Sequence, residues 1–85
     1  MRIDRLLCCL RFVRTRSAAR TLVDEGHIRV NGERVQRASR TIAAGDVLTL
    51  PLGDSVRLIE VVNLPERRGP PREAQECYRE LDPGA

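Results

Sequence analysis

The chain has very few aromatic residues, and this scarcity excludes one common way of binding nucleic acids. Of its 85 residues only Phe12 and Tyr78 are aromatic, and tryptophan is absent. Proteins that hold single-stranded RNA or DNA usually stack the bases on rows of aromatic side chains. A nucleic-acid surface on this chain would therefore have to recognise phosphates and shape.

Residues that build disulfide frameworks, metal sites and catalytic centres are also scarce. Cys8 and Cys9 are sequence neighbours and Cys77 lies far away, which fits neither a disulfide framework nor a four-ligand zinc site. His27 is the only histidine, and no base, nucleophile or metal ligand is suitably spaced around it. We therefore expect no metal, no other cofactor, no catalytic residue and a reducing cytoplasmic location.

No apolar stretch is long enough for a secretory signal or a membrane span. Residues 6–10 form an apolar run of five between Arg5 and Arg11, whereas a secretory core needs about 7–15 residues and a membrane helix about 20. Hydrophobic residues make up 41% of the chain and charged residues 32%. This balance is typical of one small soluble domain with a modest core.

Lysine is absent, so all fifteen basic residues are arginines. A guanidinium is a planar fork that can hold a phosphate with two hydrogen bonds. Residues 1–50 hold ten arginines against five acids, net +5, while residues 51–85 hold five arginines against seven acids, net −2. This segregation concentrates positive potential in the N-terminal part and indicates a polyanionic partner there.

Two amphipathic helices are predicted at the N-terminus. Apolar residues from Ile3 to Leu10 recur at i, i+3, i+4 and i+7, which predicts a helix over about residues 2–12. Thr15 can cap a second helix, which Gly26 can end. The apolar face of this second helix consists of Ala18, Ala19, Leu22 and Val23.

A small sheet is predicted after the helices. Asn31 and Gly32 are the preferred pair for a two-residue hairpin turn, because both turn positions require a positive φ. A turn at residues 43–46 leads into strands at residues 47–50 and 56–62. The predicted fold class is α+β, with two helices packed on a small, mainly antiparallel, curved sheet.

The C-terminal part is predicted to be a linker followed by a short helix. Prolines at residues 65–71 remove amide donors and favour an extended segment. Helical spacing then returns in Ala74, Cys77, Tyr78 and Leu81, with Pro71 suited to the first turn. We therefore divide the chain into a domain at residues 1–64 and a linker with a helix at residues 65–85.

The start of the second helix is the strongest candidate for a binding site. Its arginines oppose the helix dipole, which disfavours cations at an N-terminus by about 0.3–1 kcal/mol each, so local stability does not explain them. Free N–H groups, hydroxyls and guanidiniums together suit a phosphate. The residues are Arg14, Thr15, Arg16, Ser17 and Arg20. The alternative is a solvated polar face with an ordinary cap.

The predicted hairpin offers a second basic edge. Its arginines are Arg29, Arg34, Arg37 and Arg40, and its neutral donors are Asn31 and Ser39. Because strand residues that face solvent are usually polar, this edge alone could also be an ordinary surface.

Four segments, in order and spacing, resemble the S4 RNA-binding domain family. They are residues 2–7, 15–20, 26–32 and 44–48. The resemblance implies an S4-like, or alpha-L, fold in which the basic helix start and the hairpin edge bind structured RNA. It also implies a set of RNA-binding residues: Arg2, Arg5, Arg14, Thr15, Arg16, Ser17, Arg20, Arg29, Asn31, Arg34 and Arg37.

Residues 66–70, followed by a helix containing Tyr78, resemble the small ribosome-associated heat-shock branch of this family. That resemblance implies a stress-response role in the rescue or recycling of large ribosomal subunits that carry a stalled nascent chain on transfer RNA. The expected partners are ribosomal RNA of the large subunit and this transfer RNA. We expect no membrane, no small-molecule substrate and a monomeric protein.

Three other classes of function compete with this interpretation. Some S4 domains are attached to enzymes, but 85 residues leave no room for a catalytic domain, so we expect no enzyme. A helix-turn-helix DNA-binding protein would share the two basic helices but would not normally continue into a hairpin and strands. In a protein-interaction module, the acidic C-terminal half would bind the partner.

Overall fold

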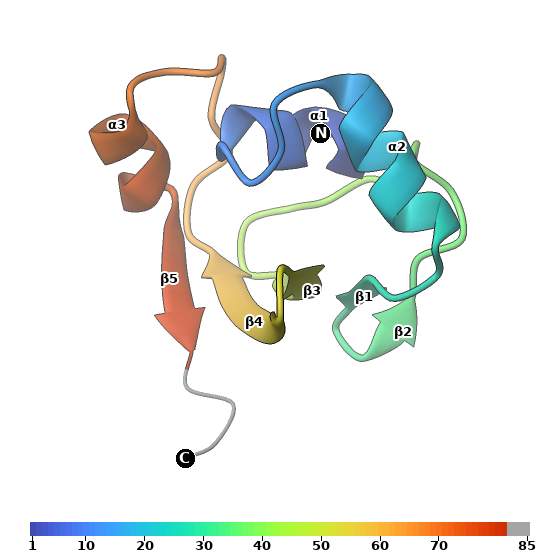
Figure 1. Cartoon of the computed structure of the whole chain (residues 1–85). Helices are drawn as coiled ribbons and strands as arrows, with labels where there is room; N and C mark the ends of the chain where they lie inside the picture. The colour runs from blue at the N-terminus through green and yellow to red at the C-terminus, as the bar shows by residue number, and fades with distance from the viewer. Residues whose placement is uncertain (82–85) are drawn as a thin grey trace.

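Two short helices lie over a five-stranded antiparallel sheet in the computed structural model, which describes residues 1–81 (Figure 1). The helices are α1 (Ile3–Cys9), α2 (Arg16–Asp24) and α3 (Pro71–Glu76), and the strands are β1 (Arg29–Val30), β2 (Glu33–Arg34), β3 (Val47–Leu52), β4 (Ser55–Val61) and β5 (Tyr78–Leu81). The sheet order is β2-β1-β3-β4-β5. The α+β class predicted from the sequence is confirmed.

The first helix is shorter than its apolar pattern predicts. It ends at Cys9, and Arg11 adopts a left-handed φ of 66°. The backbone N–H of Phe12 then bonds to the carbonyl of Leu7 at 3.0 Å, which folds the chain back over the end of α1. This early turn brings α2 alongside α1, as Figure 1 shows.

The ends of α2 follow the local chemistry that the sequence predicts. Thr15 is the N-cap, and its hydroxyl oxygen accepts a hydrogen bond from the backbone N–H of Ala18 at 3.0 Å. Gly26 follows the helix with a φ of +82°. A side chain at this position would also collide with Arg34, because a Cβ would lie 2.6 Å from its Nη2 atom. Glycine is therefore favoured here by its positive φ, whereas the Arg34 side chain could move aside for a Cβ.

The core lies between α1 and the sheet. The predicted apolar face of α1 is buried, with Ile3, Leu6, Leu7 and Leu10 all 2% exposed or less. Burial of side chains of this size stabilises a fold by about 1.5–3 kcal/mol each. The prediction for α2 is partly wrong, because Ala19 and Val23 are buried while Ala18 is exposed. Since α2 packs mainly on α1, only a narrow stripe of α2 is covered.

The hairpin between β1 and β2 forms at the predicted turn. Asn31 and Gly32 have φ values of 51° and 83°, and Val30 pairs with Glu33 on either side of them. These two positive angles are what a two-residue turn of this type needs. Strand β1 also pairs with β3, so the hairpin is anchored to the larger part of the sheet.

The last helix predicted from the sequence is wrong beyond residue 76. Helix α3 begins at Pro71, but Tyr78 and Leu81 lie in strand β5, where they pair with Val61 and Leu58 of β4. The free edge of β4 offers the backbone hydrogen bonds that a lone turn of helix cannot match. Tertiary pairing therefore overrides the helical spacing.

Segment 66–69 is held against α1 by arginines. Arg5 donates to the carbonyl of Glu66 at 2.8 Å, Arg11 donates to that of Gly69 at 3.0 Å, and Arg68 donates to that of Cys8 at 3.1 Å. The division at residue 64 remains a prediction. Among residues 1–81, no helix is long and apolar enough to span a bilayer.

Candidate nucleic-acid interface

One buried carboxylate gathers arginines from the two N-terminal helices. Asp4 is fully buried, and its Oδ2 accepts a hydrogen bond from Nη2 of Arg2 at 3.1 Å. Nη2 of Arg16 and Nε of Arg20 lie 3.4 and 3.5 Å from the same oxygen. Its Oδ1 accepts a hydrogen bond from the backbone N–H of Arg5 at 2.7 Å. We call Asp4, Arg2, Arg16 and Arg20 the Asp4 cluster.

The carboxylate of this cluster stays ionised. Burial alone would raise the pKa of Asp4, but the backbone hydrogen bond from Arg5 and the charges of Arg16 and Arg2 outweigh burial, so the pKa lies below its ordinary value. One negative and three positive charges leave the cluster with a net charge of +2.

The arginines of the Asp4 cluster remain open to solvent. Their side chains are 47% exposed for Arg2, 48% for Arg16 and 57% for Arg20. The Asp4 cluster also explains how cations are tolerated at the start of α2. The sequence alone gave no such explanation. Asp4 offsets the unfavourable dipole there, while the outer edges of the guanidiniums stay available to a ligand.

The other predicted residues of the two N-terminal helices lie outside the Asp4 cluster, and they differ in exposure and in hydrogen bonding. Arg14 and Ser17 are exposed. The hydroxyl of Thr15 accepts the capping hydrogen bond from Ala18, so its acceptor function is engaged inside the protein. Arg5 points to the C-terminal segment, where it holds the carbonyl of Glu66. The structure therefore does not bring Arg5 into the Asp4 cluster.

The hairpin edge carries a second group of arginines. Arg34, Arg37 and Arg40, with Glu33 and Gln36, line a surface hollow of about 350 Å³. We call these three arginines the hairpin cluster. A hollow with three guanidiniums on its wall suits an anionic group.

Two predicted residues of the hairpin turn make internal hydrogen bonds. Nη1 of Arg29 donates to the carbonyl of Gly32 at 3.3 Å. The amide of Asn31 donates to Asp46 at 3.1 Å and accepts from the backbone N–H of Val47 at 2.9 Å. The side chain of Asn31 therefore fixes the start of β3 instead of standing free as a neutral donor.

Backbone hydrogen bonds join the two clusters. The N–H groups of Ile3 and Asp4 donate to the carbonyls of Arg40 and Ala38, at 2.8 and 3.2 Å. Arg2 also forms an isolated antiparallel bridge with Thr41. The chain that leaves the hairpin cluster thus runs beside the start of α1, where Asp4 lies. The predicted helix start and hairpin edge belong to adjoining parts of one surface.

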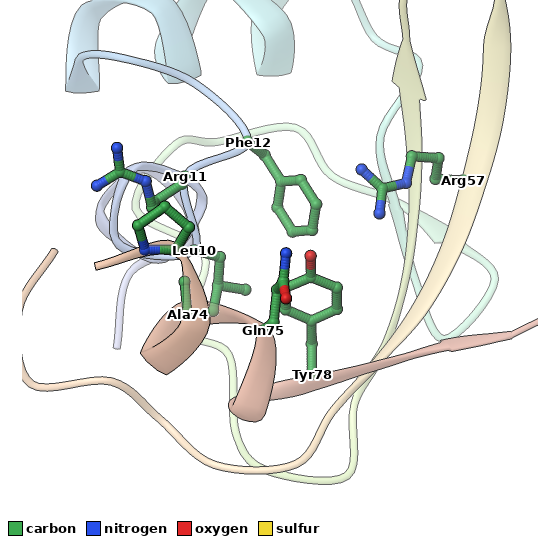
Figure 2. A pocket seen from close by; sticks show the side chains of 8 residues that line it. Leu10, Arg11, Phe12, Arg57, Ala74, Gln75 and Tyr78 are labelled. Carbon is green, nitrogen blue, oxygen red and sulfur yellow. The ribbon is translucent and has the colours of Figure 1, made fainter. Parts of the chain in front are cut away.

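The two aromatic residues meet at a separate hollow of about 220 Å³, which Figure 2 shows beside α3. The rings of Phe12 and Tyr78 have centroids 4.9 Å apart, and the guanidinium of Arg57 lies 5.0 Å from the centroid of Phe12. Arg57 also bonds to Glu80, and Arg11 bonds to Gly69. These contacts pack the C-terminal elements onto the domain. Within residues 1–81, no three metal-ligating side chains are grouped to hold an ion.

Sequence reasoning missed Asp4 as a functional candidate. The available signal was an acid beside the apolar face of the first helix, within an arginine-rich segment. Arg40 was assigned to the basic edge but was left out of the implied RNA-binding set, and it lines the same hollow as Arg34 and Arg37.

Comparison with known proteins identifies a matching family and several relatives that are similar in sequence. A sequence model of the S4 domain matches residues 1–48. Heat shock protein 15 of Escherichia coli (strain K12) is 34% identical over 80 residues, which cover 94% of this chain and 59% of that protein. The heat shock protein 15 homolog of Haemophilus influenzae is 30% identical over 82 residues, covering 96% and 62%. The chain thus spans about three fifths of the length of these relatives.

Two further similarities extend this result. The small ribosomal subunit protein uS4 of Dinoroseobacter shibae is 39% identical over 71 residues, which cover 81% of this chain and 34% of that protein. A solved structure, described as a trimeric structure of Vibrio cholerae heat shock protein 15, matches with a TM-score of 0.90 and 34% identity. The match covers 95% of this chain and 81% of that chain.

Proposed function

Because the chain belongs to the S4 domain family, we propose that it binds structured RNA through its N-terminal arginines and catalyses no reaction. The observation that carries this proposal is the Asp4 cluster, in which three half-exposed guanidiniums surround one buried carboxylate. Such a cluster presents fixed positive charge without aromatic side chains. That arrangement suits the phosphates and the shape of folded RNA.

The proposed RNA-binding surface comprises the Asp4 cluster, the hairpin cluster and the other residues that the resemblance to the S4 family implies. Its proposed members are Arg2, Arg5, Arg14, Thr15, Arg16, Ser17, Arg20, Arg29, Asn31, Arg34, Arg37 and Arg40. Within this set, the Asp4 and hairpin clusters supply the main phosphate contacts. The side chains of Arg5, Thr15, Arg29 and Asn31 contribute by fixing the backbone, since they bond within the protein.

The proposed RNA is ribosomal RNA of the large subunit, and the proposed process is rescue or recycling of subunits that carry a stalled nascent chain on transfer RNA. Similarity to heat shock protein 15 over 94% of the chain supports this assignment, as does the resemblance of residues 66–70 to the heat-shock branch. Similarity to a ribosomal protein supports ribosomal RNA as the ligand class. A ribosomal ligand implies action in the cytoplasm.

Binding to purified nucleic acids at several salt concentrations tests the RNA proposal. The probes are large-subunit ribosomal RNA, small-subunit ribosomal RNA, transfer RNA and duplex DNA. If about 4–6 phosphates are engaged, the slope of log affinity against log salt should be near −3 to −5. Preference for duplex DNA would favour a DNA-binding protein. A flat salt dependence or no binding would favour a protein-interaction module.

Crosslinking in cells, followed by sequencing of the attached RNA, tests the ribosomal assignment. Enrichment of large-subunit ribosomal RNA is expected. Enrichment of small-subunit ribosomal RNA would contradict the large-subunit assignment while leaving RNA binding intact.

We also propose that the protein acts as a monomer, whereas the Vibrio cholerae relative is described as trimeric. Sedimentation of the protein alone and with RNA distinguishes these states. A trimer in the free protein would contradict the proposal.

A further inference from the structure

Asp4 is the one buried polar or charged side chain among residues 1–81. A buried carboxylate is costly unless it is paired and hydrogen-bonded. Here every partner except the backbone N–H of Arg5 is a guanidinium, and these arginines come from the start of α1 and from two successive turns of α2. The position of the carboxylate therefore determines where these arginines meet.

The three arginines would not gather in this way without an anion. Arg16 and Arg20 are four residues apart on one helix, where like charges repel. Arg16 is also the first residue of α2, at the positive end of the helix dipole. One nitrogen of each of the three arginines lies within 3.5 Å of Oδ2 of Asp4, so no two of these nitrogens can be farther apart than twice that distance.

Each guanidinium keeps donors that Asp4 does not use. Arg2 and Arg16 bond to the carboxylate through Nη2, and Arg20 bonds through Nε. A guanidinium has five N–H donors, so the opposite edge of each fork remains for a second acceptor. With side chains about half exposed, those edges can reach a ligand in solvent.

We propose that Asp4 is a positioning residue, which holds the arginines of the Asp4 cluster together as one preformed site for a phosphate of the RNA backbone. The inference rests on the proposed RNA binding and adds a role for an acidic residue in a surface that binds an anion. Preformed side chains lose less conformational freedom when the ligand arrives, so they bind it more tightly.

This role predicts an effect opposite to that of simple charge. The substitution Asp4→Asn makes the protein more positive by one charge, which should strengthen the binding of a polyanion if Asp4 only neutralises arginines. If Asp4 positions the arginines, the same substitution should weaken the affinity for large-subunit ribosomal RNA by about tenfold. The sign of the change therefore separates the two roles.

The matched control is Asp24→Asn at the exposed end of α2. It adds the same charge, and among the described residues no ion pair joins Asp24 to the Asp4 cluster, so its affinity for large-subunit ribosomal RNA should equal or exceed that of the wild type. Weaker binding by D4N with unchanged or tighter binding by D24N supports positioning. Binding by D4N as tight as the wild type, or tighter, overturns the proposal.

A coupling measurement shows whether Asp4 acts through the arginines. In a background with Arg16→Ala and Arg20→Ala, the further substitution D4N should weaken RNA affinity far less than in the wild type, because two of the three positioned side chains are gone. A tenfold loss that persists in this background would contradict positioning. No binding by the wild type at any salt concentration would instead overturn the proposed function, so the two failures are distinguishable.

A third measurement uses only the wild-type protein, so it tests the proposal even if the D4N variant does not fold. Nuclear magnetic relaxation of the arginine Nε–H groups reports side-chain order in the absence of RNA. We expect Arg20 to be ordered in the free protein and Arg14, which is exposed, to be mobile. Equal mobility of the two side chains would overturn the proposal.

Discussion

In the C-terminal half of the described residues each ion-paired arginine has a glutamate of its own, whereas three arginines of the N-terminal half share one aspartate. The C-terminal pairs are Arg57–Glu80, Arg79–Glu60 and Arg67–Glu73. These pairs are neutral, while the Asp4 cluster keeps a net charge of +2. In the C-terminal half, arginines therefore form neutral ion pairs. In the N-terminal half, arginines leave positive charge at the surface.

The two halves also differ in what their arginines hold. Two C-terminal pairs cross from β4 to β5 and secure the last strand. The Asp4 cluster joins the start of α1 to the start of α2 and leaves guanidinium edges in solvent. The net charge of each half would not reveal this difference. The difference depends on how many arginines share each acid within a contact.

Removing two arginines from each half should give the largest contrast. The double variant R16A/R20A should lose about 2–4 kcal/mol of RNA-binding free energy, or roughly 30- to 700-fold in affinity at low salt, because charge-assisted hydrogen bonds are lost. The double variant R57A/R79A removes the same charge but should change the affinity far less. Filter binding to large-subunit ribosomal RNA measures both, with folding checked by circular dichroism. Equal losses would mean that only net charge matters.

Replacing Tyr78 should affect stability and leave RNA binding unchanged. Tyr78 is half-buried and packs against Phe12, so Tyr78→Ala should lower the free energy of unfolding by about 2 kcal/mol, less than for a fully buried aromatic residue. Urea denaturation measures this loss, and Tyr78→Phe is the control that keeps the ring. Weaker RNA binding by folded Y78A would assign an RNA contact to the C-terminal half.

Acid should act on the Asp4 cluster within a defined pH range. Because the pKa of folded Asp4 lies below its ordinary value of 3.8, its contribution to stability is present above 3.8 and is lost as the pH falls through the folded value. The difference in unfolding free energy between the wild type and D4N should therefore shrink below pH 3.8. Urea denaturation of both proteins across this range measures it. A difference that is constant with pH would contradict an ionised, stabilising Asp4.

Features set by neighbouring residues could be predicted from the sequence. The cap at Thr15, the turn at Asn31 and Gly32, and the buried face from Ile3 to Leu10 all depend on local chemistry or helical spacing. The arginine-rich part of the surface could be located for the same reason, since charge segregation is visible in the sequence.

Features set by distant residues could not be predicted. Strand β5 forms because it pairs with the edge of β4. The residues around Tyr78 give no local sign that this edge is available for pairing. The burial of Asp4 depends on Arg16 and Arg20, which reach it from another helix. The internal hydrogen bonds of Asn31 likewise require Asp46 and the start of β3 to be in place.

The affinity for large-subunit ribosomal RNA, measured against salt concentration for the wild type and for R16A/R20A, tests whether the N-terminal arginines bind RNA phosphates. We expect a log–log slope near −3 to −5 for the wild type and a slope shallower by about 1 for the variant, because the one phosphate site of the Asp4 cluster is lost. A wild-type slope near zero, or identical slopes for the two proteins, would contradict it.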